Sequence, residues 1–456
     1  MTADPQSAAA DLDRVNAALA TRWPETRLEP SLERIRALVD LLGQPQRSYP
    51  VVHLTGTNGK TSTARMIDAL LRGLGLRTGR FTSPHLESVT ERISLDGQPL
   101  DVERFVAAYD DIASYVELVD ADQAVPMSFF EVLAGMAFAA FADAPVDVAV
   151  VEVGMGGGWD ATNVADAQVA VLLPVDLDHT AYLGGTPAAV AVEKAGIIKR
   201  GAVAVLAQQS VDVAEVLLRR AAEVKATVAR EGIEFGVVSR AVAVGGQLVD
   251  LQGLEGRYDE LLLPLHGAHQ AHNAACAVAA VEALVGGSQP LDADVVRRAL
   301  ASVDSPGRLE VVRRSPTVVL DAAHNPAGAR AAVAGLEEAF DFTRLVGVVG
   351  VVSDKDVMGI LEPLEPVLAE VVVTQSTSPR ALPADDLAAL AVEVFGVDRV
   401  EVVPRLDDAL EAGVRLAEEE GDLGGAGVLV TGSVITVGEA RRLLRGPTGP
   451  AGIEDS

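Results

Sequence analysis

The residues best suited to chemistry lie in a short glycine-containing segment between an apolar run and an amphipathic stretch. The segment consists of Gly56, Thr57, Asn58, Gly59, Lys60, Thr61 and Ser62. In a strand-to-helix turn, backbone N–H groups and the positive end of the helix dipole bind anions. Lys60 can reach the β- and γ-phosphates of a nucleotide, and the hydroxyl of Thr61 or Ser62 can bind Mg²⁺. We predict a phosphate-binding loop, although Leu54 replaces the first glycine of the usual motif; the alternative is an ordinary glycine-rich turn.

A carboxylate at the end of an apolar run is the best candidate for binding a metal. Glu152 ends the run VDVAVVEV, where burying an unpaired carboxylate would be costly. At the carboxyl end of a parallel strand it would instead face a ligand crevice. The alternative is a glutamate paired with a nearby arginine. His179 follows another apolar run, and taken alone it would be a hydrogen-bonded structural residue.

The chain uses lysine sparingly. It has five lysines, Lys60, Lys194, Lys199, Lys225 and Lys355, against 37 basic residues in total. Taken from its neighbours alone, Lys194 in EKAGIIK belongs to a solvated Glu–Lys pair on a helix. A buried lysine would titrate more readily and could stay neutral and reactive.

Composition excludes several classes of protein. The formal net charge of −28 argues against a nucleic-acid or anionic-membrane surface. The single cysteine, Cys276, forms no internal disulfide and is expected in a buried helix. No apolar run is long enough to span a membrane and no signal-peptide pattern opens the chain, so we expect a soluble cytoplasmic protein.

The pattern of apolar runs predicts an α/β protein. Runs near 147–153, 168–175 and 202–208 fit buried parallel strands, and the stretch 226–264 suggests a small antiparallel excursion. A second series follows at 317–321, 345–350, 371–375, 400–403 and 428–433. A boundary within 301–307, rich in Ser, Asp, Pro and Gly, divides the chain into domains 1–303 and 304–456. The first and last dozen residues are expected to be frayed tails.

A series of motifs gives a resemblance to a known family. GTNGKTS after an apolar run resembles the Mur ligase superfamily, and FTSPHLESVTERI (81–93) is similar to its dihydrofolate synthase and folylpolyglutamate synthase branch. Further matches follow in order, including SFFE, VEVGMGGGWDATN, LDHTAYLG, EKAGIIK, HQAHNA, SPGRLE, LDAAHNP, SDKD and TGSVITVGEAR. They span residues 51 to 441.

The resemblance implies a fold and an activity. The fold would be an N-terminal P-loop ATPase-type parallel-sheet domain with a small antiparallel β excursion, followed by a C-terminal doubly wound, Rossmann-like domain. The activity would be ATP-dependent ligation of L-glutamate to dihydropteroate, to the γ-carboxylate of folates, or to both, through an acyl phosphate. The alternatives are a cell-wall Mur-type amino-acid ligase, against which SPHL and SFFE argue, and a P-loop ATP-binding regulator without ligase activity.

The resemblance also implies roles for residues around the nucleotide. It implies two Mg²⁺ sites, the second of them with Ser83, Glu152 and His179 among its ligands. Lys194, rather than Lys199, would be carbamylated and would bind the second Mg²⁺. The residues implied near ATP are Gln270, Asn273, Arg308 and Asp321, with His324 near the γ-phosphate or the incoming glutamate.

The implied partners are small molecules: ATP, L-glutamate and a pteroyl or folyl substrate, bound by a monomer. The substrate residues would be Ser128, Phe130, Asp160, Ala161, Lys355 and Ser433. Because Phe129 and Phe130 are adjacent, only one of them can face a given pocket. The family commonly has an arginine where this chain has Gly158, so its substrate recognition or loop rigidity is expected to differ.

Overall fold

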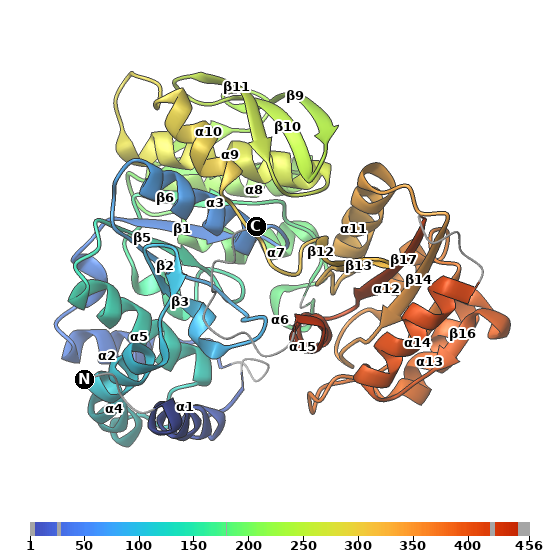
Figure 1. Cartoon of the computed structure of the whole chain (residues 1–456). Helices are drawn as coiled ribbons and strands as arrows, with labels where there is room; N and C mark the ends of the chain where they lie inside the picture. The colour runs from blue at the N-terminus through green and yellow to red at the C-terminus, as the bar shows by residue number, and fades with distance from the viewer. Residues whose placement is uncertain (1–4, 25–28, 179, 420–424, 446–456) are drawn as a thin grey trace.

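The computed structural model describes residues 5–24, 29–178, 180–419 and 425–445. Two α/β bodies lie side by side, each built on its own sheet, with the antiparallel hairpin strands packed on top of the first (Figure 1). α10 (Ala293–Ala301) ends the first body and β12 (Glu310–Arg314) begins the second. The predicted boundary at 301–307 therefore falls in the connection between them.

The first body contains an eight-stranded sheet in the order β4-β3-β2-β5-β1-β6-β7-β8. Its strands are β1 (Val51–Thr55), β2 (Thr78–Phe81), β3 (Ile93–Leu95), β4 (Gln98–Pro99), β5 (Val148–Glu152), β6 (Val169–Leu172), β7 (Val203–Leu206) and β8 (Thr227–Arg230). Six strands run parallel: β2, β5, β1, β6, β7 and β8. β3 and β4 add an antiparallel edge that the sequence analysis did not predict. The predicted strands near 147–153, 168–175 and 202–208 are confirmed.

Helices cover both faces of this sheet, so its central strands are buried on both sides. One face packs against α3 (Lys60–Gly73) and α9 (Ala268–Val285), and Cys276 is fully buried in α9 as predicted. The other face packs against α2 (Glu33–Leu41), α4 (Val102–Asp122) and α5 (Phe129–Asp143). α6 (Thr180–Leu183), α7 (Pro187–Lys194) and α8 (Val211–Val224) complete the body.

The prediction of a frayed N-terminal dozen is wrong from Pro5 onward. α1 (Pro5–Ala20) is a helix that packs on the core through Leu12, Val15 and Leu19. These residues recur at helical spacing, and burying one apolar face is what stabilises such a helix. The predicted C-terminal tail lies outside the described residues except for its first position.

The antiparallel excursion predicted for 226–264 is confirmed as a three-stranded sheet of β9 (Gly236–Ala243), β10 (Gly246–Gln252) and β11 (Arg257–Leu263). Its predicted start is wrong, because β8 at 227–230 pairs in parallel with β7 in the large sheet. The three-stranded sheet packs on α9 and α10, so it extends the first body.

The second body contains a six-stranded sheet in the order β12-β13-β17-β14-β15-β16. Its five predicted parallel strands are β13 (Thr317–Leu320), β14 (Arg344–Val349), β15 (Glu370–Val373), β16 (Val400–Val402) and β17 (Ala426–Thr431). β12 is an unpredicted antiparallel edge strand. The covering helices are α11 (Pro326–Ala339), α12 (Val357–Leu364), α13 (Ala384–Phe395), α14 (Leu406–Glu419) and α15 (Val434–Arg445). Within the described ranges, no helix has the length and apolar character needed to cross a membrane.

Candidate active site

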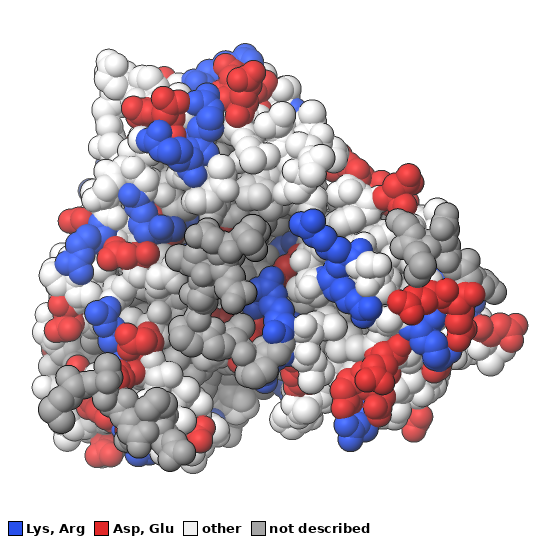
Figure 2. Space-filling model, viewed as in Figure 1, with Lys and Arg blue, Asp and Glu red and all other residues white. Residues whose placement is uncertain are grey.

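Two adjoining hollows occupy the cleft between the bodies. Figure 2 shows Lys and Arg side chains beside the depression that separates the two lobes. We call the first the loop hollow, because the segment 56–62 lines it together with α9 and the segment 321–324. We call the second the aromatic hollow, because Trp23, Phe130 and Trp159 line it. Six residues line both hollows and mark their border: Ser83, Pro84, Gly154, Met155, His324 and Val434.

The segment 56–62 forms a tight turn at the N-terminus of α3. Gly59 is the N-cap with φ +86°, and a Cβ there would lie 2.6 Å from Asn273 Oδ1, so glycine is required. The backbone N–H of Thr57 donates to Pro174 O (2.9 Å) and its hydroxyl donates to Asp176 O (2.8 Å). These bonds hold the turn against the segment that follows β6. Lys60 Nζ folds back to Gly56 O at 3.0 Å. The geometry is that of a phosphate cradle.

Glu152 ends β5 at the floor of the loop hollow. Its carboxylate accepts hydrogen bonds from Thr61 Oγ1 (2.9 Å) and from the backbone N–H of Ser83 (3.4 Å). Burial raises the pKa of Glu152 to about 7, although Lys60 opposes this shift. Among the described residues no arginine forms an ion pair with Glu152. The alternative of a glutamate paired with a nearby arginine is therefore wrong. Ser62 instead shares a hydrogen bond with Ser305 (2.9 Å), which leaves Thr61 as the hydroxyl beside Glu152.

Lys194 lies at the end of α7 and is buried, not solvated as its neighbours in sequence suggested. Its Nζ donates to Gly56 O at 2.9 Å, on the phosphate-binding turn. Burial lowers the pKa of Lys194 to about 7, and repulsion from Lys60 adds to the shift. Lys199 lies elsewhere, where its Nζ donates to Asn163 O at 2.9 Å.

The second body contributes side chains that meet the first across the cleft. Lys355 Nζ lies 2.6 Å from Asp178 Oδ1, and His324 Nε2 lies 3.9 Å from Asp178 Oδ2. The amides of Asn58 and Asn325 bond to each other in both directions, at 3.3 and 3.1 Å. The sequence analysis missed Asp178, although an acid after an apolar strand was visible beside His179. His179 itself lies outside the described residues.

The other predicted nucleotide residues all line the loop hollow: Gln270, Asn273, Arg308 and Asp321. Asn273 Nδ2 donates to Gln270 Oε1 at 3.1 Å, so the two amides hold each other in α9. Asp321 accepts the backbone N–H groups of Leu309 (3.0 Å) and Ala323 (2.9 Å), so its carboxylate also shapes the turn that carries His324. Burial raises the pKa of Asp321 and lowers that of His324 to about 4.

The predicted substrate residues line the aromatic hollow: Ser128, Phe130, Asp160, Ala161, Lys355 and Ser433. Phe130 lies beside the Phe81 ring, with 5.6 Å between centroids, whereas Phe129 packs under the guanidinium of Arg92. Ser128 Oγ accepts the backbone N–H of Glu131 (3.1 Å), so this hydroxyl caps α5. Burial raises the pKa of Asp160 to about 6, and its carboxylate accepts the backbone N–H of Met155 at 3.0 Å.

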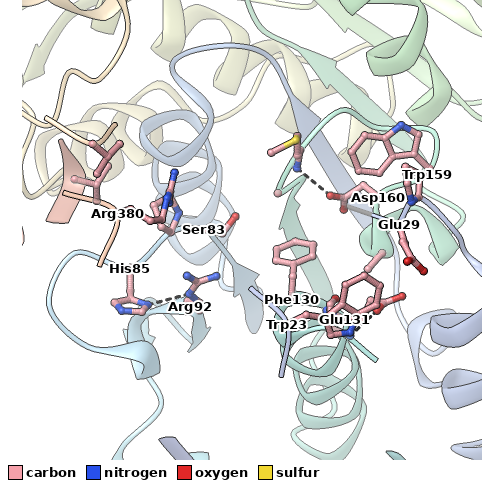
Figure 3. A pocket seen from close by; sticks show the side chains of 18 of the residues that line it. Trp23, Glu29, Ser83, His85, Arg92, Phe130, Glu131, Trp159, Asp160 and Arg380 are labelled. Atoms are coloured by element: carbon pink, nitrogen blue, oxygen red, sulfur yellow. Dashed lines mark hydrogen bonds between the residues drawn. The ribbon is translucent and has the colours of Figure 1, made fainter. Parts of the chain in front are cut away.

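Sequence reasoning missed about two thirds of the residues that line the aromatic hollow. The missed residues with charged, imidazole or indole side chains are Trp23, Glu29, Arg34, His85, Arg92, Glu131, Trp159 and Arg380. Figure 3 shows His85, Arg92 and Arg380 on one side of the space, with Trp23, Glu131 and Trp159 on the other. Arg34 forms a buried ion pair with Glu131 (3.0 Å) and lies 5.0 Å from the centroid of the Trp23 ring. Both tryptophans of the chain line this hollow, a rarity that could have drawn attention to them.

Gly158 lies where two chain segments touch. Its N–H donates to Glu193 O (3.0 Å), and a Cβ on Gly196 would lie 2.4 Å from Gly158 Cα. A side chain at 158 would begin 2.9 Å from Glu193 Oε1, which accepts the backbone N–H of Trp159. An arginine at 158 would therefore displace a carboxylate that holds Trp159 in place.

Comparisons with known proteins agree with this geometry. The family model for the "Mur ligase, glutamate ligase domain" matches residues 307–434. The dihydrofolate synthase/folylpolyglutamate synthase of Mycobacterium tuberculosis is 54% identical over 95% of this chain and 94% of that protein. The folylpolyglutamate synthase of Lacticaseibacillus casei is 33% identical over 91% of this chain and 94% of that protein.

Solved structures give the same result. Mycobacterium tuberculosis folylpolyglutamate synthase complexed with ADP and AMPPCP superposes with a TM-score of 0.92 at 54% identity, covering 97% of this chain and all of that one. Escherichia coli FolC in complex with DHPP and ADP gives 0.83 at 29% identity, covering 96% and 98%. The chain therefore belongs to the dihydrofolate synthase/folylpolyglutamate synthase family of ATP-dependent glutamate ligases.

Proposed function

We propose that the chain adds L-glutamate to dihydropteroate, to the γ-carboxylate of folates, or to both, with ATP converted to ADP and phosphate. The observation that carries this proposal is the shared border of the two hollows at Ser83 and His324. A ligase must bring the γ-phosphate of ATP against an acceptor carboxylate, and here a phosphate cradle and an aromatic hollow open onto one another.

The reaction has two steps. ATP lies in the loop hollow with Lys60 near its phosphates, and an acceptor carboxylate oxygen attacks the γ-phosphorus, which releases ADP and leaves an acyl phosphate. The amine of glutamate then attacks the acyl carbon, the amide forms and phosphate leaves. Closing the two bodies on the substrates excludes water, which would otherwise hydrolyse the acyl phosphate.

The donors at Glu152 fit a magnesium ion. Its carboxylate and the Thr61 hydroxyl are hard oxygen donors within hydrogen-bond distance of each other, and no cation among the described residues forms an ion pair with the buried carboxylate. Among those residues no group of three or more His, Cys, Asp and Glu lies together, and His179 is not one of them. We propose that Thr61 and Glu152 hold one Mg²⁺, and that Ser83, Glu152 and His179 help to hold the second. When bound, Mg²⁺ neutralises phosphate charge.

Lys194 is proposed to carry a carbamate. Its neutral amine adds to carbon dioxide, a C–N bond forms, and one proton leaves to solvent. The lowered pKa makes the neutral amine available near neutral pH, and the product turns a buried cation into an anion beside Lys60. Such an anion suits the second Mg²⁺. An oxygen-bearing extension on Lys194 in an experimental electron-density map would be the direct test.

We assign glutamate to the end of the aromatic hollow formed by the second body. Lys355 and Arg380 supply cations, and Ser433 precedes α15, whose first N–H groups can bind a carboxylate. His324 remains neutral near pH 7 because burial lowers its pKa, and its Nδ1 lies 3.0 Å from Ala322 O. Nε2 is thereby left as an acceptor that can orient the amine of glutamate at the border.

The test is a phosphate-release assay in which the acceptor varies. Dihydropteroate, folates and UDP-muramyl substrates are each supplied with and without L-glutamate, and the product mass is measured. We expect glutamate-dependent phosphate release with a pteroyl or folyl acceptor. Release with the UDP-muramyl acceptor would indicate the cell-wall activity, and release without any acceptor would contradict a ligase. Sedimentation would test the expected monomer, and expression of domains 1–303 and 304–456 would test the proposed boundary.

A further inference from the structure

The segment Ser83–Arg92 forms one wall of the aromatic hollow and is folded around a single carboxylate. Glu91 accepts the backbone N–H groups of Leu86 (2.9 Å), Glu87 (2.9 Å) and Ser88 (2.8 Å). At its ends, Ser83 N–H bonds to Glu152 and Arg92 Nε donates to His85 Nδ1 at 2.9 Å. The segment is therefore a compact unit that carries four residues lining the hollow: Ser83, Pro84, His85 and Arg92.

This unit rests directly on α15 of the second body. A Cβ on Gly438 would lie 1.8 Å from Leu86 O, so the helix approaches the backbone as closely as glycine permits. Arg441 bridges two carboxylates: its NH1 bonds to Glu87 in the first body, and its Nε donates to Glu310 (2.9 Å) in the second. All three side chains are at most 15% exposed. Arg442 adds a bond to Glu87 O at 2.7 Å.

The same helix carries the opposite wall. Ser433, Val434 and Ile435 line the aromatic hollow at the start of α15, two turns before Arg441. Different contacts join the bodies elsewhere, including the Asn58–Asn325 amide pair beside the loop hollow and the Arg240–Glu338 ion pair. Changes at Arg441 should thus act mainly on the aromatic hollow and reach the loop hollow only at the border residues Ser83, Pro84 and Val434.

We propose that Arg441 is a positioning residue that fixes the Ser83–Arg92 segment against the start of α15, and so sets acceptor and glutamate binding together. This inference rests on the proposed ligase function. Removing Arg441 would leave the buried carboxylate of Glu87 without its ion-pair partner, whereas Glu310 keeps Arg445 at 2.7 Å. A buried carboxylate without its partner is costly, so the segment would move away from α15.

The test compares Arg441→Met with Arg415→Met in steady-state kinetics. Arg415 also bridges two glutamates, Glu401 (2.9 Å) and Glu419 (2.8 Å), but it is half-exposed and lies wholly within the second body. For Arg441→Met we expect KM for the acceptor and for glutamate to rise roughly tenfold, as is usual for coupled sites. KM for ATP should stay within about twofold, and Arg415→Met should match the wild type.

A second variant and a second measurement make the result decisive. Glu87→Gln removes only the arm between the bodies, so it should give the same KM pattern at smaller size, and it serves if Arg441→Met does not fold. Hydrogen exchange should rise in a peptide covering 84–92 and stay unchanged in one covering 56–63. The inference would be overturned if the wild type ligates and the variants leave KM for the acceptor and for glutamate unchanged. It would also be overturned if KM for ATP rises as much as the other two. A wild type without ligase activity would contradict the proposed function instead.

Discussion

The loop hollow and the aromatic hollow differ in how the chain builds them. The phosphate cradle of the loop hollow is a single strand-to-helix turn of seven consecutive residues, 56–62, although the other residues that line this hollow come from both bodies. The aromatic hollow draws on segments near 23–34, 83–92, 128–131, 154–161 and 352–380, and on the start of α15. A nucleotide phosphate can thus be bound by local structure, whereas an aromatic acceptor needs walls that only the tertiary fold brings together.

The hollows also differ in how charge is held. In the loop hollow, the partly buried Lys60 lies near the buried Glu152 and Lys194. Desolvation lowers the pKa of both lysines and raises the pKa of Glu152, so it favours the neutral form of each. In the aromatic hollow, the Arg34–Glu131 pair is buried and mutually compensated beneath the Trp23 ring. The first arrangement is suited to binding charged ligands, and the second to holding a wall in shape.

The largest effect is expected at Lys60. Lys60→Ala should lower the rate of glutamate-dependent phosphate release roughly a hundredfold to a thousandfold, because a preorganised cation near the phosphates is lost. Acceptor binding, followed by tryptophan fluorescence, should persist, since both tryptophans line the other hollow. Lys225→Gln, at the exposed end of α8, is the control and should behave as the wild type. If Lys60→Ala abolished both phosphate release and acceptor binding, the two hollows would not be functionally separable.

Breaking the Arg34–Glu131 ion pair should lower the free energy of unfolding while leaving the rate of the phosphate chemistry less affected. Arg34→Met leaves Glu131 as a buried uncompensated carboxylate, and we expect the free energy of unfolding to fall by about 3–5 kcal/mol. Urea denaturation measures this. Arg14→Met removes an exposed pair with Asp110 and should cost less than about 1 kcal/mol. Equal costs for the two variants would contradict the contrast between buried and exposed pairs.

Asp160 makes the stability of the aromatic hollow depend on pH. Burial raises its folded-state pKa from 3.8 to about 6, so between these values the folded state keeps a proton that the unfolded state releases. Stability contributed at this site is therefore lost as pH rises from about 4 to about 6, by at most about 3 kcal/mol. Urea titrations of wild type and Asp160→Asn across this range measure the effect. The difference in free energy of unfolding should shift in favour of the variant as pH rises, because the other groups titrate equally in both proteins. Parallel curves would refute the shift.

The smallest effect is expected at the tryptophans. Trp23→Phe and Trp159→Phe should each weaken pteroyl-ligand binding by about fivefold, the scale of one aromatic contact. In the wild type, a pteroyl ligand should quench most of the tryptophan emission, while a non-hydrolysable ATP analogue should leave it nearly unchanged. Quenching by the nucleotide alone would mean that the two hollows communicate.

The sequence predicted what local patterns encode. Most parallel strands of the two sheets, the loop 56–62 and the position of Glu152 followed from apolar runs that end in polar residues, but the parallel strands β2 and β8 were not predicted. The strands β3 and β4 were missed because they are only three and two residues long, and β12 was missed because it is mostly exposed, so their patterning is weak. The walls formed by Trp23 and Arg380 could not be predicted, because neither lies in a motif and their approach depends on how the helices and the two bodies pack.

The resemblance to a family supplied what patterns alone could not. Lys194 has the local sequence of a solvated helix residue, and only its contact with Gly56 O shows that it belongs to the loop hollow. Asp178 was not predicted from any motif, although it forms an ion pair with Lys355 across the cleft.

The scarcity of lysine has a practical consequence for handling the protein. Four of the five lysines are buried or partly buried, three of them in the cleft, and Lys225 is the exposed one among these five described positions. An amine-reactive dye or resin will therefore modify the lysine side chains chiefly at the end of α8, away from both hollows. Protein attached there would keep its cleft open, which suits surface-based binding measurements with small ligands.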